Sequence, residues 1–434
     1  MLDGDYKYLN YYEHALYNHI LASQDPDMPG CVTYYTSLLP GSFKQYSTPF
    51  DSFWCCVGTG MENHSKYAES IYFKDNQELL VNLYIPSRLH WKEKGLKLTL
   101  DTYFPESDTV TVRMDEIGSY TGTLLFRYPD WVSGDAVVRI NGEPAQTEAH
   151  KGSYIRLLDS VKSGDVITLV FTRNLYIDYA KDEPHFGSVM YGPILLAGGL
   201  GTDDMPEDRV IDNRACRESL PAKNIPMLVG PLTDLDSWIQ CSSQHPLRFT
   251  VKNGGGQQGV GLVPYFQMHH QRHTVYWKLY SPDEFVYRTR SLTDEVKIGD
   301  ETDERKHALQ GENDSIYWHD YFWAKNTRFR MAKDGWFSYT LHINKTEQKP
   351  YHLICRFWGD EPDTCQFDIL IDGNYLRTVS LNRKLYLTYV DDVYSIPADW
   401  TRGKDKVNVT FRAAQGKNAG GLYELKITSD TNYR

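Results

Sequence analysis

Trp54-Cys55-Cys56-Val57-Gly58-Thr59-Gly60-Met61-Glu62-Asn63-His64 places two adjacent cysteines just before a predicted helix start. Neighbouring cysteines are poorly suited to a disulfide with each other, because one peptide link holds their Cα atoms closer together than bridge geometry prefers. At a helix start, unpaired backbone N–H groups and the positive end of the helix dipole favour the thiolate form of both sulfurs. The pair therefore predicts a soft-metal or reactive-thiolate site, and the alternative is two buried, inert cysteines.

The helix after the cysteine pair is predicted to begin near Thr59. Thr59 and Glu62 have the T-x-x-E spacing of a capping box. The buried side of this helix is expected to consist of Met61, Ala68 and Ile71.

An earlier helix is predicted to end at Asp25-Pro26, because proline disfavours helical geometry in the residue before it. Apolar side chains recur there at three- and four-residue spacing, and they are Tyr8, Tyr11, Tyr12, Ala15, Leu16 and Ile20. Residues 1–78 are therefore expected to be helical. Their one-sided stripes need covering surface that the chain is not expected to encode.

From Leu79 the apolar period changes to two, which predicts β-strands. Asn141-Gly142 and Asp372-Gly373 are expected to be hairpin turns. The sequence thus indicates a mainly β fold with an N-terminal helical segment (1–78), a β-sandwich domain (79–285) and a C-terminal β-sandwich module (286–434). The predicted strands are 96–100, 110–112, 137–140, 166–171, 189–197, 275–280, 336–341, 369–371 and 407–411.

Composition excludes several classes of protein. Acidic residues outnumber basic ones, 57 to 46, and the net charge of −11 argues against a nucleic-acid partner. No apolar stretch has membrane-spanning length, and the N-terminus does not have the pattern of a signal peptide. Seven scattered cysteines argue against a disulfide framework.

Two segments, Tyr12 to Gln24 and Cys55 to Tyr67, resemble the β-L-arabinofuranosidases of glycoside hydrolase families 127 and 146. These are retaining enzymes that use a cysteine nucleophile on zinc. The likeness continues more weakly from Tyr191 to Ile194, from His269 to Trp277 and around Leu309 to Asn313. The resemblance covers nearly the whole chain, and the double-cysteine segment is its specific part.

The resemblance implies that residues 1–78 are a remnant of an (α/α)6 helical barrel, the catalytic domain of that family. It implies that Cys55 is the nucleophile and a zinc ligand, and that Cys56 is a ligand only. It also implies that Tyr34 contacts the sugar, although Tyr35 matches the family tyrosine nearly as well. Cys31 is a weaker candidate for a third ligand, because the family site has no counterpart to it.

In that family a Glu-x-Cys motif upstream of the cysteine pair supplies two further zinc ligands, and the acid/base glutamate also lies upstream. No Glu-x-Cys occurs before Cys55 here. We therefore expect the C-terminal portion of a longer or split enzyme, inactive alone, with a separate chain able to supply the other half of the barrel. A periplasmic or secreted location is expected if a full-length form carries a signal.

Other candidates within the chain have structural alternatives. Glu62 could be the acid/base, but the capping role is favoured. His64 either faces the site or satisfies a buried backbone group. For His269, His270 and His273, a metal site is disfavoured, because no carboxylate or cysteine joins them and strand alternation would put His270 on the face opposite the other two.

The acidic run Asp300 to Glu304 is expected to be solvated surface rather than a calcium site. Four tryptophans could form a sugar-binding platform, namely Trp318, Trp323, Trp336 and Trp358. We expect most of them to pack inside the sandwich instead. The rival hypothesis for the whole chain is a non-catalytic carbohydrate-binding or scaffolding protein, in which the sandwiches act and the helices are vestigial.

Overall fold

The computed structural model describes residues 6–38, 40–52, 55–181, 183–203, 205, 225–252, 260–319, 327–359, 361, 364–382 and 389–430. The chain divides into two compact units, Met1–Ser281 and Pro282–Arg434, which are described separately below. Strands predominate in both, as the sequence predicts. Within the described residues, no helix is long and apolar enough to cross a bilayer.

The N-terminal segment is only partly helical, so the prediction of a helical 1–78 is wrong. Helix α1 continues into one π-helical stretch, η1, and a short antiparallel pair of strands, β1 and β2, separates them from helix α2. Because α2 begins at Cys55, Thr59 and Glu62 lie inside it and form no capping box. The bounds are α1 Tyr6–Ala15, η1 Leu16–Leu21, β1 Thr33–Thr36, β2 Lys44–Tyr46 and α2 Cys55–His64.

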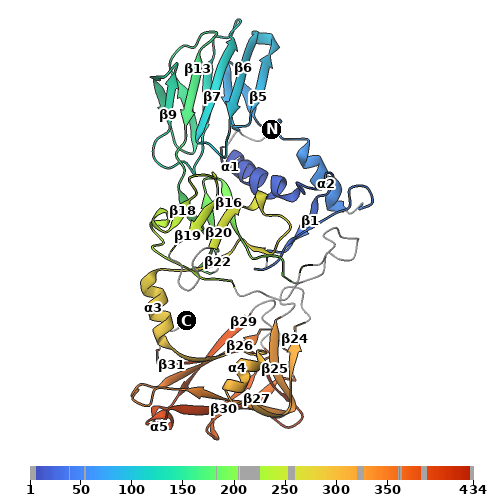
Figure 1. The fold of residues 1–434 in the computed structure, drawn as a ribbon, viewed down its shortest axis with the longest axis vertical. Helices are drawn as coiled ribbons and strands as arrows, with labels where there is room; N and C mark the ends of the chain where they lie inside the picture. The colour runs from blue at the N-terminus through green and yellow to red at the C-terminus, as the bar shows by residue number, and fades with distance from the viewer. Residues whose placement is uncertain are drawn as a thin grey trace. The chain divides into compact units, whose positions relative to one another are not determined.

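The buried face of the first helix also differs from the predicted stripe. Tyr8 and Tyr11 are 43% and 74% exposed, whereas Leu9, Leu16 and Tyr17 are buried. The reason is that the covering surface lies within the chain: α1 lies against other parts of the first unit (Figure 1), where its Glu13 bonds to Arg127 and Trp131. On α2 likewise, Met61 is exposed rather than buried.

Two sheets follow and enclose one core, which makes the first predicted sandwich. One has the order β10-β9-β13-β7-β6-β5 and the other β11-β12-β8-β4-β3. The predicted turn at Asn141-Gly142 is confirmed, with φ of 50° and 89°. The bounds are β3 Tyr72–Asp75, β4 Glu78–Val81, β5 Ser87–Trp91, η2 Lys92–Lys94, β6 Leu96–Thr102, β7 Thr109–Glu116, β8 Thr123–Tyr128, β9 Val137–Ile140, β10 Glu143–Pro144, β11 Thr147–Ala149, β12 Ser153–Leu157 and β13 Val166–Val170.

A further sheet completes the first unit, with the order β17-β22-β15-β16-β20-β19-β18. The predicted single strand 189–197 is a hairpin of β15 and β16, because the chain reverses at Gly192, where φ is 57°. The bounds are β14 Leu175–Tyr179, β15 Phe186–Tyr191, β16 Ile194–Gly199, β17 Leu228–Val229, η4 Leu235–Ser237, β18 Ile239–Cys241, β19 Phe249–Val251, β20 Val260–Pro264, η5 Tyr265–Gln267, β21 His273–Thr274 and β22 Trp277–Tyr280.

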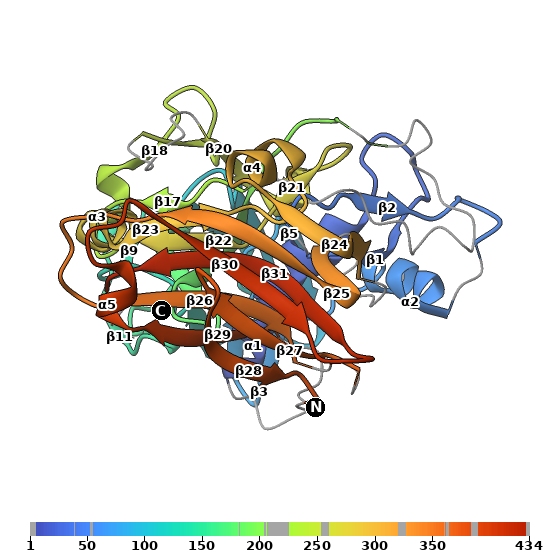
Figure 2. The ribbon, with the colours of Figure 1, turned by 90° about the horizontal axis from the view of Figure 1, so that it is seen from below.

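The second unit is a curved sheet of order β28-β27-β30-β25-β31-β26-β29 around its own core. Figure 2 shows β25, β30 and β31 side by side, and the predicted turn at Asp372-Gly373 joins β27 to β28. The bounds are α3 Pro282–Ser291, β23 Leu292–Val296, α4 Glu301–Lys306, β24 Gln310–Trp318, β25 Arg328–His342, β26 Tyr351–Trp358, β27 Gln366–Ile371, β28 Asn374–Ser380, β29 Tyr389–Ile396, α5 Ala398–Thr401, β30 Lys406–Ala413 and β31 Asn418–Thr428.

The acidic run of the second unit is not plain solvated surface. Asp300 caps α4 by accepting hydrogen bonds from the backbone N–H groups of Thr302 and Asp303. Glu304 is buried and pairs with Arg330 at 2.9 Å. The run therefore fixes a short helix to β25.

The tryptophans of the second unit divide between core and surface. Trp358 is buried, as sandwich packing predicts, whereas Trp318 is 49% exposed and lies against the Arg328 guanidinium. Trp336 donates a hydrogen bond to Glu312 at 3.3 Å. Trp323 lies outside the described residues.

Candidate functional site

The cysteine pair occupies the first turn of α2, beside β1 (Figures 1 and 2). The Cys56 side chain is exposed. The first turn of a helix carries unpaired N–H groups and the positive end of the dipole, and both favour a thiolate there. The backbones of Cys55 and Tyr34 lie in α2 and β1, but their side chains are outside what the structure describes. Their assigned roles remain predictions.

A cavity of about 350 Å³ opens in the first unit between η1, β1 and the β15–β16 hairpin. Thr33 and Thr36, which flank Tyr34 and Tyr35 in β1, both line it. Its volume is at the lower end of the range for small-molecule sites, which suits a single small sugar. The other lining residues are His14, Asn18, His19, Ala22, Ser23, Leu38, Asp178, Ser188, Met190, Leu195, Tyr265, Val275 and Tyr276.

Polar groups of η1 and the end of α1 shape one wall of this cavity. The Asn18 amide donates to the carbonyl of Pro193 at 2.8 Å and accepts from the N–H of Leu195 at 2.8 Å, so it fixes η1 to the β15–β16 turn. Burial, then the nearby His19, lower the pKa of His14. A neutral imidazole can both donate a hydrogen bond to and accept one from sugar hydroxyls.

His64, in the last turn of α2, contacts two hydroxyl groups. Its Nδ1 lies 2.6 Å from the Tyr67 hydroxyl and its Nε2 lies 3.4 Å from Ser23 Oγ. Ser23 also lines the cavity, so α2 reaches the cavity wall through this end. Cys56, eight residues earlier, lies about 12 Å away along the helix axis. The structure thus brings the predicted Tyr34 strand to the cavity and sets Cys56 toward the other end of α2.

Glu62 lies inside α2 and does not have the predicted capping role. Its carboxylate is exposed and pairs with the Lys66 ammonium at 2.8 Å. The hydrogen bond from Lys66 lowers the pKa of Glu62. A general acid needs a raised pKa to hold its proton near neutral pH, so this environment disfavours acid/base catalysis by Glu62.

Cys31 is also a poor zinc ligand. Its side chain is fully buried, and desolvation together with the charge of Asp25 raises the pKa of its thiol. Zinc binds the thiolate, so this environment opposes the ligand role.

The His269–His273 run is a turn followed by a short strand, and not one continuous strand. His269 Nδ1 lies 2.5 Å from the Tyr46 hydroxyl, and the backbone of His273 pairs with the loop at Gly41 and Ser42. Burial and the nearby Lys44 lower the pKa of His269 and of His273 to about 4. The imidazole of His269 and the backbone of His273 attach the β1–β2 segment to the third sheet.

Sequence reasoning missed the partners of the remaining histidine. His270 Nε2 lies 3.0 Å from Asp25 Oδ1 and 3.1 Å from Asp27 Oδ2, and Asp25 is buried. The two aspartates of Asp25-Pro26-Asp27 were visible in the sequence, but the 242 residues between Asp27 and His270 gave no sign of the contact.

Two groups of three ligand atoms could hold a metal among the residues described, and neither contains a cysteine. They are Asp25, Asp27 and His270 in the first unit and Asp294, His307 and His342 in the second. At α2, the exposed thiol of Cys56 in a first helical turn is chemically suited to zinc. Two cysteines are half of a tetrahedral shell.

Comparisons with known proteins place the cysteine pair in a family context. The family model for the β-L-arabinofuranosidase GH127 catalytic domain matches residues 1–69, and the GH127 middle domain matches residues 78–173. A domain of unknown function, DUF4986, matches residues 176–279, and a family of unknown function, DUF6805, matches residues 289–428. Comparison with curated proteins found no match.

The solved structures matched by this chain include a glycoside hydrolase at 20% identity and a TM-score of 0.48, covering 64% of this chain and 49% of that chain. A GH127 β-L-arabinofuranosidase from Geobacillus stearothermophilus T6 has 19% identity and a TM-score of 0.46, covering 64% and 47%. A family 35 carbohydrate-binding module from Clostridium thermocellum has 14% identity and a TM-score of 0.21, covering 28% and 92%.

The chain spans about half the length of the two glycoside hydrolases. The catalytic-domain match includes α1, η1, β1, β2 and the cysteine-bearing α2, and the middle-domain match includes the first sandwich. By its catalytic and middle domains, the chain resembles the glycoside hydrolase family 127 β-L-arabinofuranosidases.

Proposed function

We propose that the chain contributes the nucleophile and a sugar-binding wall to a retaining β-L-arabinofuranosidase that acts on plant-derived, arabinose-containing glycans. The observation that carries the proposal is the double cysteine in the first turn of α2, within the segment matched by the GH127 catalytic domain. The cavity beside β1 supports it, because this cavity is small and lined by several polar side chains.

Cys55 is the nucleophile in this proposal. Its thiolate attacks the anomeric carbon, a C–S bond forms, and the glycosidic C–O bond breaks as a carboxylic acid protonates the leaving oxygen. Water then attacks the thioglycosyl carbon with the same carboxylate as base, which restores the configuration and releases the thiolate.

Zinc would be held by Cys55 and Cys56, where it would keep the thiols deprotonated at neutral pH. The helix start supports the same protonation state, because its N–H groups and dipole stabilise a negative charge. A free thiol has a pKa near ~8.5 and would be mostly protonated at neutral pH without such help.

The acid/base and two further zinc ligands are assigned to a second polypeptide segment. No Glu-x-Cys precedes Cys55, and Glu62 is held ionised by Lys66. Exposed apolar side chains at Tyr8, Tyr11 and Met61 would supply contact area for such a segment.

The test is hydrolysis of an aryl β-L-arabinofuranoside in the presence of zinc. The chain alone should show negligible turnover. The chain mixed with a polypeptide that carries a Glu-x-Cys barrel half should release the aryl group at a glycosidase rate, and Cys55→Ala should abolish it.

Cys241→Ser is the matched control, because Cys241 is an exposed cysteine of the same unit, in β18. It should leave the activity of the mixture unchanged. An active mixture carrying Cys55→Ala would refute the nucleophile assignment. A mixture that binds oligosaccharide but never hydrolyses it would favour the carbohydrate-binding rival.

A further inference from the structure

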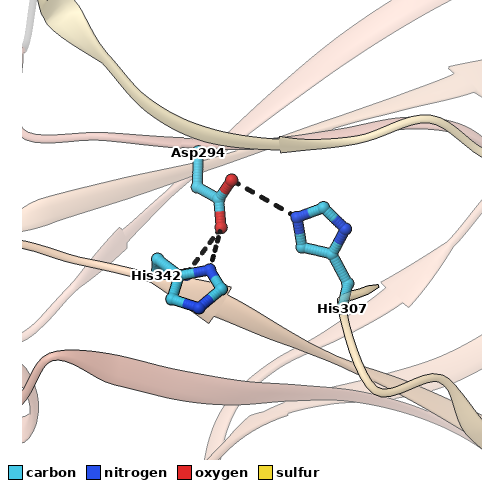
Figure 3. A group of neighbouring side chains, drawn as sticks. All are labelled: Asp294, His307 and His342. Carbon is cyan, nitrogen blue, oxygen red and sulfur yellow. Dashed lines mark hydrogen bonds and ion pairs between the residues drawn. The ribbon is translucent and has the colours of Figure 1, made fainter. Parts of the chain in front are cut away.

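Three metal-ligating side chains converge in the second unit, outside the cysteine site (Figure 3). Asp294 lies in β23, His307 follows α4, and His342 is the last residue of β25. Asp294 Oδ1 lies 3.3 Å from His307 Nε2, and Asp294 Oδ2 lies 3.1 Å from His342 Nδ1. One ligand atom from each residue lies within 4.8 Å of the others.

The backbone holds this group in place. The N–H of Glu295 donates to Asp294 Oδ1 at 2.9 Å, and the N–H of His342 donates to Asp294 Oδ2 at 2.6 Å. The carbonyl of His307 accepts from the N–H of Thr340 at 2.7 Å, which fixes the histidine beside β25. The carboxylate is therefore oriented before any ligand arrives, which lowers the cost of binding.

The hydrogen positions on His307 follow from its neighbours. Its Nδ1 lies 2.8 Å from the carbonyl oxygen of Asp303 and 3.5 Å from the Asp303 carboxylate, and both can only accept. The hydrogen of a neutral imidazole must therefore be on Nδ1. Its Nε2 then directs a lone pair at the Asp294 carboxylate, 3.3 Å away. A cation bound between this lone pair and the carboxylate oxygen would contact both acceptors.

We propose that Asp294, His307 and His342 form a binding site for a divalent transition-metal ion of the zinc class. Two ligand atoms that each lie about 2.0–2.1 Å from a tetrahedral zinc ion are roughly 3.4 Å apart. The distances from His307 Nε2 to Asp294 Oδ1 and from His342 Nδ1 to Asp294 Oδ2, 3.3 and 3.1 Å, are close to this separation. His307 Nδ1 donates a hydrogen bond to the Asp303 carbonyl, which leaves Nε2 of the same ring as the metal-binding nitrogen. Metal-binding histidines commonly have such a hydrogen bond on the other ring nitrogen.

The ligand set also selects the metal. Two imidazole nitrogens and one carboxylate suit zinc, nickel or copper, whereas calcium and magnesium prefer all-oxygen shells. His342 is 66% exposed, so the fourth position faces solvent and takes water. The ion would join β23, the end of α4 and the end of β25.

The test uses the full-length chain with Cys55→Ser, Cys56→Ser and His270→Ala, so that neither the predicted thiolate site nor the group of Asp25, Asp27 and His270 can contribute. Equilibrium dialysis against zinc should give one bound ion per chain, and zinc should raise the melting temperature of the second unit. Adding His342→Ala, at an exposed position that should not disturb folding, should abolish both effects. His352→Ala, on β26 of the same sheet, is the matched control and should keep them.

Calcium in place of zinc should neither bind nor stabilise. Absence of bound zinc in the parent would refute the site. Zinc that persists in the His342→Ala variant would also refute it. Neither outcome bears on Cys55, because that thiol is absent from every variant of this experiment.

Discussion

The N-terminal segment 6–69 and the second unit are ordered by different means. The second unit encloses a continuous apolar core of alternating strand residues such as Phe337, Tyr339 and Leu341. The N-terminal segment has short helices and one strand pair, and specific contacts with the sheets of its unit hold it. The position of its cysteine pair therefore depends on a few long-range contacts, its anchors, whereas the stability of the second unit depends on many similar apolar contacts.

The strongest of these anchors is a buried ion pair. Glu13 accepts hydrogen bonds from the Arg127 guanidinium and from the Trp131 indole N–H, the latter at 2.7 Å. Glu13 is 2% exposed and Arg127 is fully buried. Removing one partner of such a pair leaves a buried charge without compensation.

The largest expected effect is therefore that of Glu13→Gln, which should destabilise the first unit by about 3–5 kcal/mol. Urea unfolding, followed by hydrogen exchange of amides in each unit, measures it. Glu304→Gln removes the corresponding ion pair of the second unit, where Arg330 keeps its pair with Asp314, and should destabilise only that unit. An unchanged first unit in Glu13→Gln would show that the ion pair is not an anchor.

Asn18→Ala tests the second anchor and should have a smaller effect. It removes both hydrogen bonds to the β15–β16 turn and should cost about 1–3 kcal/mol. The same unfolding measurement applies. Asn63→Ala on α2 is the control, because the structure shows no side-chain hydrogen bond for Asn63, and it should be neutral. Equal effects of both substitutions would contradict the anchoring role.

The third anchor, the His269–His273 loop, should have the smallest effect at neutral pH, and its contribution should change only in acid. Burial lowers the pKa of His269 and His273 from 6.5 to about 4. Between these values the unfolded chain binds protons that the folded chain does not, so stability is full above pH 6.5 and falls as the pH decreases toward 4.

Urea midpoints of the first unit should show this decline, and His269→Gln with His273→Gln should flatten it. His245→Gln, at an exposed position of the same unit, should leave it unchanged. A decline that survives the double substitution would place the titrating groups elsewhere.

Much of the β architecture was predictable, because alternation and turn chemistry are local. Asn141-Gly142 and Asp372-Gly373 both adopt the positive φ angles that their hairpins need. The N-terminal segment was less predictable. Tyr8 and Tyr11 fit a helical stripe by spacing, but the buried position at Glu13 is set by Arg127, 114 residues later.

The candidate site divides in the same way. The sequence predicted the start of the helix at the cysteine pair to within a few residues. The capping role predicted for Glu62 was wrong, because the exact ends of a helix are the least predictable part of it. The groups around Asp25 and Asp294 join residues far apart in sequence, so no spacing rule could reveal them.

The central claim is that thiolates at the start of α2 bind zinc. Timed alkylation with iodoacetamide, read by peptide mass spectrometry with and without zinc, tests it most directly on the chain mixed with a polypeptide that carries a Glu-x-Cys barrel half. Zinc should slow modification of Cys55 and Cys56 and leave exposed Cys241 unaffected. Equal rates with and without zinc at Cys55 and Cys56, or protection equally strong at Cys241, would contradict the account.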